Sequence, residues 1–173
     1  MMNTTAPGVR TALDAEEFRE AMARLAAPLT IVTTHDAEGR PWGFTASAVT
    51  SVSLDPPLVL VGIAHASSCF AAFAATGEFV INVLGAQHRD TARRFAARGT
   101  DRFAGGDFDV VGGAGPPRLP DAHAALRCTV ADRVPVGDHD LILGTPTEVH
   151  TAASTRPLMW HLRQFHTFGP SPA

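Results

Sequence analysis

Residues 42–61, WGFTASAVTSVSLDPPLVLV, decide the fold of this chain. The alternation of small or hydroxylated residues with apolar ones predicts a first strand from Trp42 to Leu54. Asp55-Pro56-Pro57 then stops that strand, because proline fixes φ and cannot donate to a strand ladder. The apolar run from Leu58 to Val61 predicts a second strand, buried on both faces. We therefore expect two strands joined by a tight turn.

The first of these strands carries many hydroxyl groups, from Thr45, Ser47, Thr50, Ser51 and Ser53. Thr and Ser are common on the polar outer face of an antiparallel sheet, and composition alone favours that interpretation. The alternative is a strand against whose main chain a flat polar ligand lies.

The bulk properties are those of one globular domain. The chain has 173 residues, of which 45% are hydrophobic and 18% charged. The net charge is −3 and no basic block is longer than Arg93-Arg94, so neither nucleic acid nor a membrane is expected as a partner. Cys69 and Cys128 lie far apart, which predicts no metal site and a reducing, cytoplasmic location.

The remaining elements follow from local signals. We expect a flexible N-terminal arm over 1–13, one domain over 14–168 and a frayed tail over 169–173. Helices are predicted from the cap at Asp14 to before Pro28, from Ser67 or Ser68 to about Ala75, and over Gln87 to Ala97. Further strands are predicted over 29–35, 78–84, 124–135 and 140–150. Antiparallel hairpins dominate, so the fold class is mainly β with helical decorations, a small closed or split β-barrel.

A Rossmann domain is excluded by the residues around the one glycine cluster. Gly112-Gly113-Ala114-Gly115 is followed by Pro116 and Pro117, which leave no helix start with free amides. No βαβ unit surrounds the cluster, so any nicotinamide must be held in another way.

Two segments resemble the signature of a known family. Residues 43–47, GFTAS, and 50–59, TSVSLDPPLV, are similar to the flavin reductase-like family, the small reductase components of two-component flavin monooxygenases. The resemblance runs from about Phe18 to Trp160. It implies the split β-barrel of FMN-binding proteins, built as a homodimer with the flavin near the subunit interface.

The resemblance also implies a set of site residues. Backbone amides around 45–47 and 51–53 would bind the flavin ring, and the segment from Ser67 to Cys69 would lie near its phosphate. A loop ending in Arg102 and Phe103 would lie near the flavin, and His139 would sit on the nicotinamide side as the candidate catalytic residue. The cofactor-binding set is Thr45, Ala46, Ser47, Ser51, Val52, Ser53, Ser67, Ser68, Cys69, Arg102 and Phe103.

The function that the resemblance implies is NAD(P)H-dependent reduction of flavin. A hydride passes from NADH or NADPH to N5 of FMN or FAD, and the reduced flavin leaves for a separate monooxygenase. Two alternatives stay open: a flavin-binding electron carrier without steady NAD(P)H turnover, and an oxidase of the pyridoxamine-phosphate class. The sequence does not decide between FMN and FAD, or between NADH and NADPH.

Overall fold

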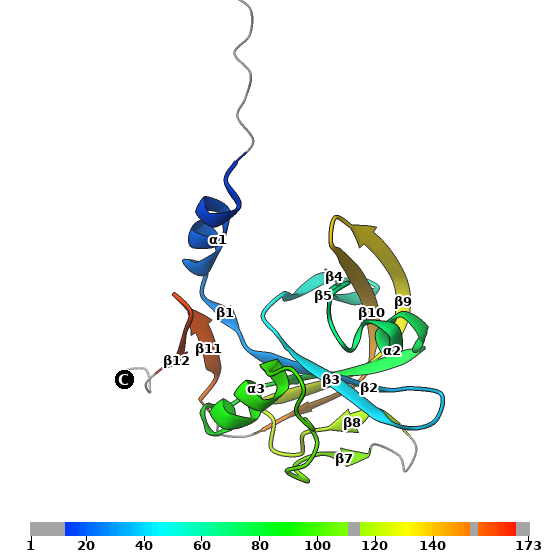
Figure 1. Cartoon of the computed structure of the whole chain (residues 1–173). Coiled ribbons are helices and arrows are strands. Elements are labelled where there is room, and N and C mark those ends of the chain that lie inside the picture. Colours follow the sequence, from blue (N-terminus) through cyan, green and yellow to red (C-terminus); the bar gives the residue numbers. More distant parts are fainter. Residues whose placement is uncertain (1–12, 111–114, 153–155, 169–173) are drawn as a thin grey trace, which may run out of the picture.

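The computed structural model describes residues 13–110, 115–152 and 156–168, and is built around a seven-stranded antiparallel sheet (Figure 1). Its strand order is β3-β2-β6-β9-β10-β5-β4. The predicted class, mainly β with helical decorations, is confirmed. The strands are β2 (Thr30–His35), β3 (Pro41–Ala46), β4 (Val49–Leu54), β5 (Pro57–Ala64), β6 (Glu78–Val83), β9 (Ala124–Val136) and β10 (His139–Thr151).

Shorter elements flank the sheet. One small sheet has the order β1-β11-β12, and another pairs β7 with β8. The short strands are β1 (Ala27–Pro28), β7 (Asp109–Val110), β8 (Pro117–Arg118), β11 (Leu158–His161) and β12 (Gln164–Thr167). The helices are α1 (Ala15–Ala23), α2 (Phe70–Ala75), the 3-10 turn η1 (Ala86–His88) and α3 (Arg89–Ala96).

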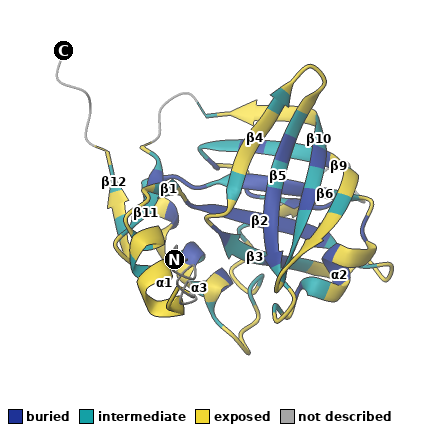
Figure 2. Ribbon diagram, turned by 90° about the horizontal axis from the view of Figure 1, so that it is seen from above, coloured by how far each residue is buried: buried dark blue, intermediate teal, exposed yellow. Residues whose placement is uncertain are grey.

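The sheet carries a hydrophobic core on each face, and its central strands are buried on both (Figure 2). Neighbours along β2 face opposite ways: Val32 joins the core that contains Phe73 of α2, while Ile31 joins the core that contains Phe95 of α3. Each strand thus alternates between two apolar environments, as a covered sheet requires. The two helices α2 and α3 therefore cover different faces.

The predicted strand from Trp42 to Leu54 is wrong as a single element. The chain bends at Ser47 and Ala48, and its halves become β3 and β4, the two opposite edges of the seven-stranded sheet. The carbonyl of Ala48 accepts a hydrogen bond from the Gly62 amide at 2.9 Å, which turns the second half onto β5. Alternation alone cannot reveal this bend, because both halves keep the strand period.

Two helix predictions need correction at their starts. The helix α2 begins at Phe70 with Cys69 as its N-cap, and the Ser67 hydroxyl instead accepts a hydrogen bond from the Cys69 amide at 3.2 Å. The helix predicted over 87–97 begins as the 3-10 turn η1 and becomes α-helical at Arg89. The segment after Gly105, for which no strand was predicted, carries the short strands β7 and β8.

His88 fixes the entry to α3. Its ring is buried, with Nδ1 accepting from the Gly85 amide at 3.0 Å and Nε2 lying 3.0 Å from Oδ1 of Asp121. These contacts tie the start of the helix to the segment that leads into β9. The position of α3 on its face of the sheet is therefore fixed by buried polar contacts as well as by Phe95.

The first helix stands away from the sheet beside β11 and β12 (Figure 1). Its predicted cap is confirmed, because the Asp14 carboxylate accepts from the Glu16 amide at 3.1 Å. Its apolar residues remain exposed: Phe18 by 53%, Met22 by 46% and, beyond the helix, Leu25 by 59%. Apart from Leu13, the predicted arm lies outside the described residues, as does the tail over 169–173. None of the described helices is long and apolar enough to cross a membrane.

Candidate active site

A hollow of about 600 Å³ opens beside the C-terminal half of β3. It is formed by four segments that lie far apart in the sequence: β3 and the bend after it, the end of β5 with the turn before α2, the end of α3 with its following loop, and the start of β10. We call it the ring hollow. Among the predicted site residues it brings together Thr45, Ala46, Ser47, Ser67, Ser68, Arg102 and His139.

The wall along β3 is an edge of the main sheet. Within the described residues, β3 pairs with β2 on one side only. The Gly43 carbonyl faces the other way, accepting from Arg102 Nη1 at 2.9 Å and from Cys69 Sγ at 3.2 Å. Because backbone direction alternates along a strand, the amide and carbonyl of Thr45 also point away from β2. The ring hollow is thus lined by main-chain groups without a ladder partner.

Small residues keep the opposite wall flat. Ala48, Ala64 and Ala66 line it, together with Gly62. A Cβ at Gly62 would lie 3.3 Å from the Cβ of Ala48, which is tighter than ordinary van der Waals contact. The arrangement therefore leaves a shallow slot in which backbone and methyl groups form the surface.

The segment from Ser67 to Cys69 divides into two roles. Ser67 and Ser68 line the ring hollow, whereas Cys69 is fully buried beneath it. The Cys69 sulfur contacts Gly43 and also lies 2.8 Å from Arg102 Nη1. The structure thus gives the cysteine a packing position, and leaves the two serines as the polar groups of this wall.

Both terminal nitrogens of the Arg102 guanidinium donate within the protein, whereas its buried Nε has no hydrogen-bond partner among the described residues. Besides Gly43 and Cys69, the guanidinium donates through Nη2 to the Ala97 carbonyl at 3.0 Å. Arg102 therefore connects the loop after α3 to β3 by hydrogen bonds and forms part of the wall of the ring hollow. Phe103, its neighbour, does not line the ring hollow; it packs edge-on against Phe95 with ring centroids 5.0 Å apart.

His139 enters the ring hollow from the start of β10, next to a second histidine. Its Nδ1 lies 2.6 Å from Oδ1 of Asp138, which leaves Nε2 for a ligand. The hydrogen bond from His139 lowers the pKa of Asp138 below its usual value, so the carboxylate stays ionised. Nearby, His65 Nε2 lies 2.7 Å from Oδ1 of Asp140. This hairpin edge thus holds two imidazoles, each fixed by a carboxylate.

Three predicted residues lie elsewhere in this chain. Ser51, Val52 and Ser53 belong to β4, the opposite edge of the sheet from β3, and none of them lines the ring hollow. Val52 is 51% exposed and sits where the register with β5 shifts. These three residues could therefore contact a flavin only from outside the ring hollow.

Sequence reasoning missed Arg98, which directly follows α3. It lines the ring hollow and is exposed, and its guanidinium makes no hydrogen bond or ion pair with the described residues. A basic residue placed between a helix end and Gly99 was the available signal. Arg98, not Arg102, is the cation of this hollow that is free to meet an anionic ligand.

Comparisons with known proteins agree on one family. Residues 22–169 match the family described as Flavin reductase like domain. An NADH:riboflavin 5'-phosphate oxidoreductase from Streptomyces pristinaespiralis is 54% identical over 164 residues, which cover 94% of this chain and 92% of that protein.

Solved structures give the same result at lower identity. The NADH:FAD oxidoreductase SgcE6 of Streptomyces globisporus C-1027, in complex with NAD and FAD fragments, is 28% identical with a TM-score of 0.86, over 92% of this chain and 96% of that one. Nitrilotriacetate monooxygenase component B from Mycobacterium thermoresistibile is 31% identical with a TM-score of 0.84, over 91% and 90%. The family indicated by residues 43–47 and 50–59 is thereby confirmed, and the chain belongs to the flavin reductase-like domain family.

Proposed function

We propose that this chain is an NADH-dependent flavin reductase acting on FMN, FAD or both. The observation that carries the proposal is the ring hollow. There, four distant segments bring together two serines, Arg98, His139 and main-chain groups of β3 that have no ladder partner among the described residues. The names of the relatives support NADH and flavin as the substrates. When both are bound, the nicotinamide ring supplies a hydride to flavin N5.

The flat wall of the ring hollow fits an isoalloxazine ring. The main-chain groups of Thr45 and the bend at Ser47 would hydrogen-bond the polar edge of the ring. They would also stabilise the negative charge that develops on the ring as it is reduced. The alanines and Gly62 would contact the ring face, where a larger side chain would fill the slot. The protein's task is to hold two rings face to face, so no strong acid–base pair is needed.

The phosphate would lie near the loop after α3. Arg98 supplies a guanidinium that has no hydrogen-bond or ion-pair partner among the described residues, and Ser67 and Ser68 supply hydroxyl donors from the adjacent wall. Arginine suits this role because its fork of N–H donors matches phosphate oxygens. This assigns the anion-binding role to Arg98 and not to Arg102, whose terminal nitrogens already donate within the protein.

His139 would bind the nicotinamide. Nδ1 donates to Asp138, so Nε2 can accept a hydrogen bond from the carboxamide NH₂ at the edge of the ring hollow. Hydride transfer itself delivers no proton to the protein, so the histidine orients the substrate and need not act as a base. Loss of the His139 side chain should therefore raise the KM for NADH.

One set of assays tests the activity. Oxidation rates of NADH and NADPH are measured with FMN, FAD and riboflavin in turn, at saturating concentrations of each. We expect NADH oxidation that depends on added flavin. Protein that stays yellow through gel filtration, and that consumes no NADH when excess flavin is added, would refute the proposal in favour of a flavin-binding electron carrier.

The finer architecture also belongs to this proposal. We take the curled seven-stranded sheet as the split β-barrel of FMN-binding proteins, in a cytoplasmic homodimer that passes reduced flavin to a separate monooxygenase. The nitrilotriacetate monooxygenase component B supports the partner by its name. Both cysteines of the described chain are free and buried, in keeping with a reducing compartment.

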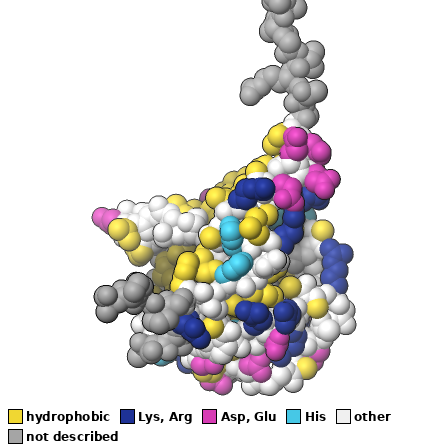
Figure 3. Space-filling view, turned by 90° about the vertical axis from the view of Figure 1, so that its left-hand side faces the viewer, with side chains coloured by type: hydrophobic (Ala, Val, Ile, Leu, Met, Phe, Trp, Pro, Cys, Tyr) yellow, Lys and Arg dark blue, Asp and Glu magenta, His cyan; other side chains and the backbone are white. Residues whose placement is uncertain are grey.

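The exposed apolar face of α1 supports the homodimer. A groove between this helix and the bend after β3 is lined by Phe18, Met22, Leu25 and Trp160, and it shares Ser47 with the ring hollow. Figure 3 shows hydrophobic side chains at the surface on this side of the molecule, below the acidic end of α1. A second copy covering this groove would complete the wall of the flavin site.

Sedimentation analysis tests the dimer. Phe18→Asp places a charge in the groove, and we expect it to dissociate the dimer and weaken flavin binding together. Ala21→Asp, which adds the same charge at an exposed position of α1 outside the groove, is the matched control. A Phe18→Asp protein that stays dimeric would rule out this face as the interface.

A further inference from the structure

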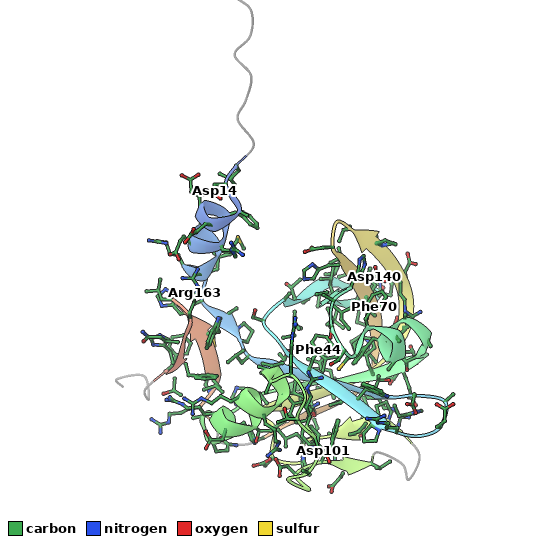
Figure 4. All side chains as sticks on the ribbon, in the orientation of Figure 1. Asp14, Phe44, Phe70, Asp101, Asp140 and Arg163 are labelled. Carbon is green, nitrogen blue, oxygen red and sulfur yellow. The ribbon has the colours of Figure 1, made fainter. Side chains whose placement is uncertain are left out.

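A second hollow, of about 660 Å³, adjoins the ring hollow. It is formed by the start of β3, from Arg40 to Gly43, and by the loop from Gly99 to Phe103. Ser68, Gly99 and Arg102 line both hollows, so the two are neighbours across a shared wall. Figure 4 labels one residue of each, Phe44 above the ribbon of β3 and Asp101 below it. We call this second space the outer hollow.

The outer hollow contains a built planar surface. The Arg40 guanidinium lies over the Trp42 ring at 4.7 Å from its centroid. Asp36 fixes both residues, because Oδ2 accepts from Trp42 Nε1 and Oδ1 accepts from the Arg40 amide, each at 2.8 Å. The hydrogen bond from Trp42 also lowers the pKa of Asp36, which keeps its carboxylate charged. The arginine side chain makes no hydrogen bond or ion pair with the described residues.

The rest of the outer hollow offers polar groups at its far end. Thr100 contributes a hydroxyl, and Asp101 a carboxylate of which Oδ1 already accepts from the Phe103 amide at 3.0 Å. A carboxylate beside a planar cationic plate matches a nucleoside, because a base stacks on arginine or an aromatic ring while an acidic side chain accepts from ribose hydroxyls. The shared wall, with Arg98 on its other side, would meet the phosphates.

We propose that the outer hollow binds the adenosine 5'-phosphate half of a dinucleotide whose other ring occupies the ring hollow. Adenine stacks on the Arg40–Trp42 plate, and Asp101 accepts from the ribose. This rests on the proposed function for the identity of the second ring. FAD and NADH both carry this half, whereas FMN and nicotinamide mononucleotide lack it.

Pairs of ligands that differ only in the adenosine half isolate the outer hollow. Dissociation constants are measured for FAD and FMN by fluorescence titration, and KM values for NADH and reduced nicotinamide mononucleotide at saturating FMN. Arg40→Ala should raise either the ratio of the FAD and FMN dissociation constants or the ratio of the KM values for NADH and the mononucleotide. We expect a rise of about five-fold or more, since stacking contributes about 1–3 kcal/mol per base. The pair that responds identifies the dinucleotide.

Three variants separate the causes. Arg40→Lys keeps the charge but loses the plane, and should resemble Arg40→Ala if stacking dominates. Trp42→Phe keeps an aromatic support and should retain most of the binding that Trp42→Leu loses. Arg89→Ala is the matched control, because Arg89 also lies over an aromatic ring, that of Phe165, and neither residue lines either hollow.

Direct binding of 5'-AMP by calorimetry keeps the test independent of reductase activity. Wild-type protein should bind AMP, and Arg40→Ala should bind it more weakly. Two results together would overturn the outer hollow as an adenosine site. The wild type would fail to bind AMP, and folded Arg40→Ala and Trp42→Leu would keep the wild-type FAD/FMN ratio of dissociation constants and the wild-type NADH/mononucleotide ratio of KM values. AMP binding without any NADH oxidation would instead refute the proposed function and leave the adenosine site standing.

Discussion

Replacing Arg98 with alanine tests where the flavin phosphate lies. The side chain is exposed at the rim of the ring hollow and has no polar partner among the described residues, so its loss disturbs no internal contact. A hydrogen bond to a charged group contributes roughly 1.5–3 kcal/mol, and exposure with salt screening favours the lower end. We therefore expect the FMN affinity to fall about ten-fold. Riboflavin, which lacks the phosphate, should bind as before.

Fluorescence titration of both flavins at low and high salt measures this effect. The wild-type preference for FMN over riboflavin should shrink with added salt, and Arg98→Ala should remove most of that dependence. Arg93→Ala is the matched control, since Arg93 is exposed on α3, the helix that Arg98 follows, and pairs with Asp90 outside the ring hollow. An unchanged FMN/riboflavin ratio, or an equal loss for both flavins, would refute the placement of the phosphate at Arg98.

Other variants probe the remaining walls. Ser47→Ala should bind flavin almost normally, whereas Ser47→Pro removes a backbone amide and should abolish binding in a folded protein; titration with normal affinity would contradict this. His139→Ala should raise the KM for NADH more than it changes flavin affinity or kcat, as measured by steady-state kinetics. A wild-type kcat/KM in this variant would refute a role for His139 in the site. Partial burial raises the pKa of Asp121, but the hydrogen bond and charge of His88, with further hydrogen bonds, outweigh it and leave the pKa lowered. The contribution of the ionised carboxylate is then present above the usual aspartate pKa and lost as pH falls through the lowered one. Asp121→Asn should therefore lower the melting temperature at pH 7 and lose this effect at the acid end, and an equal difference at both pH values would count against it.

Local signals in the sequence were enough for most elements. The Asp14 cap depends on a hydrogen bond to an amide two residues along the chain. The strands over 29–35 and 78–84 could be recognised from their β-branched and apolar residues alone. The family followed from contiguous residues for the same reason, because GFTAS and TSVSLDPPLV lie within one short stretch.

Only the tertiary structure decided how that stretch is used. Alternating residues cannot show that the chain bends at Ser47, since the hydrogen bond that fixes the bend joins Ala48 to a distant strand. Likewise, Arg98 and Arg102 look equivalent as neighbouring basic residues in one loop. Three protein acceptors, brought up by β3, the end of α3 and the turn before α2, occupy Arg102 and leave Arg98 open. The choice between them depends on long-range contacts, which a sequence pattern does not encode.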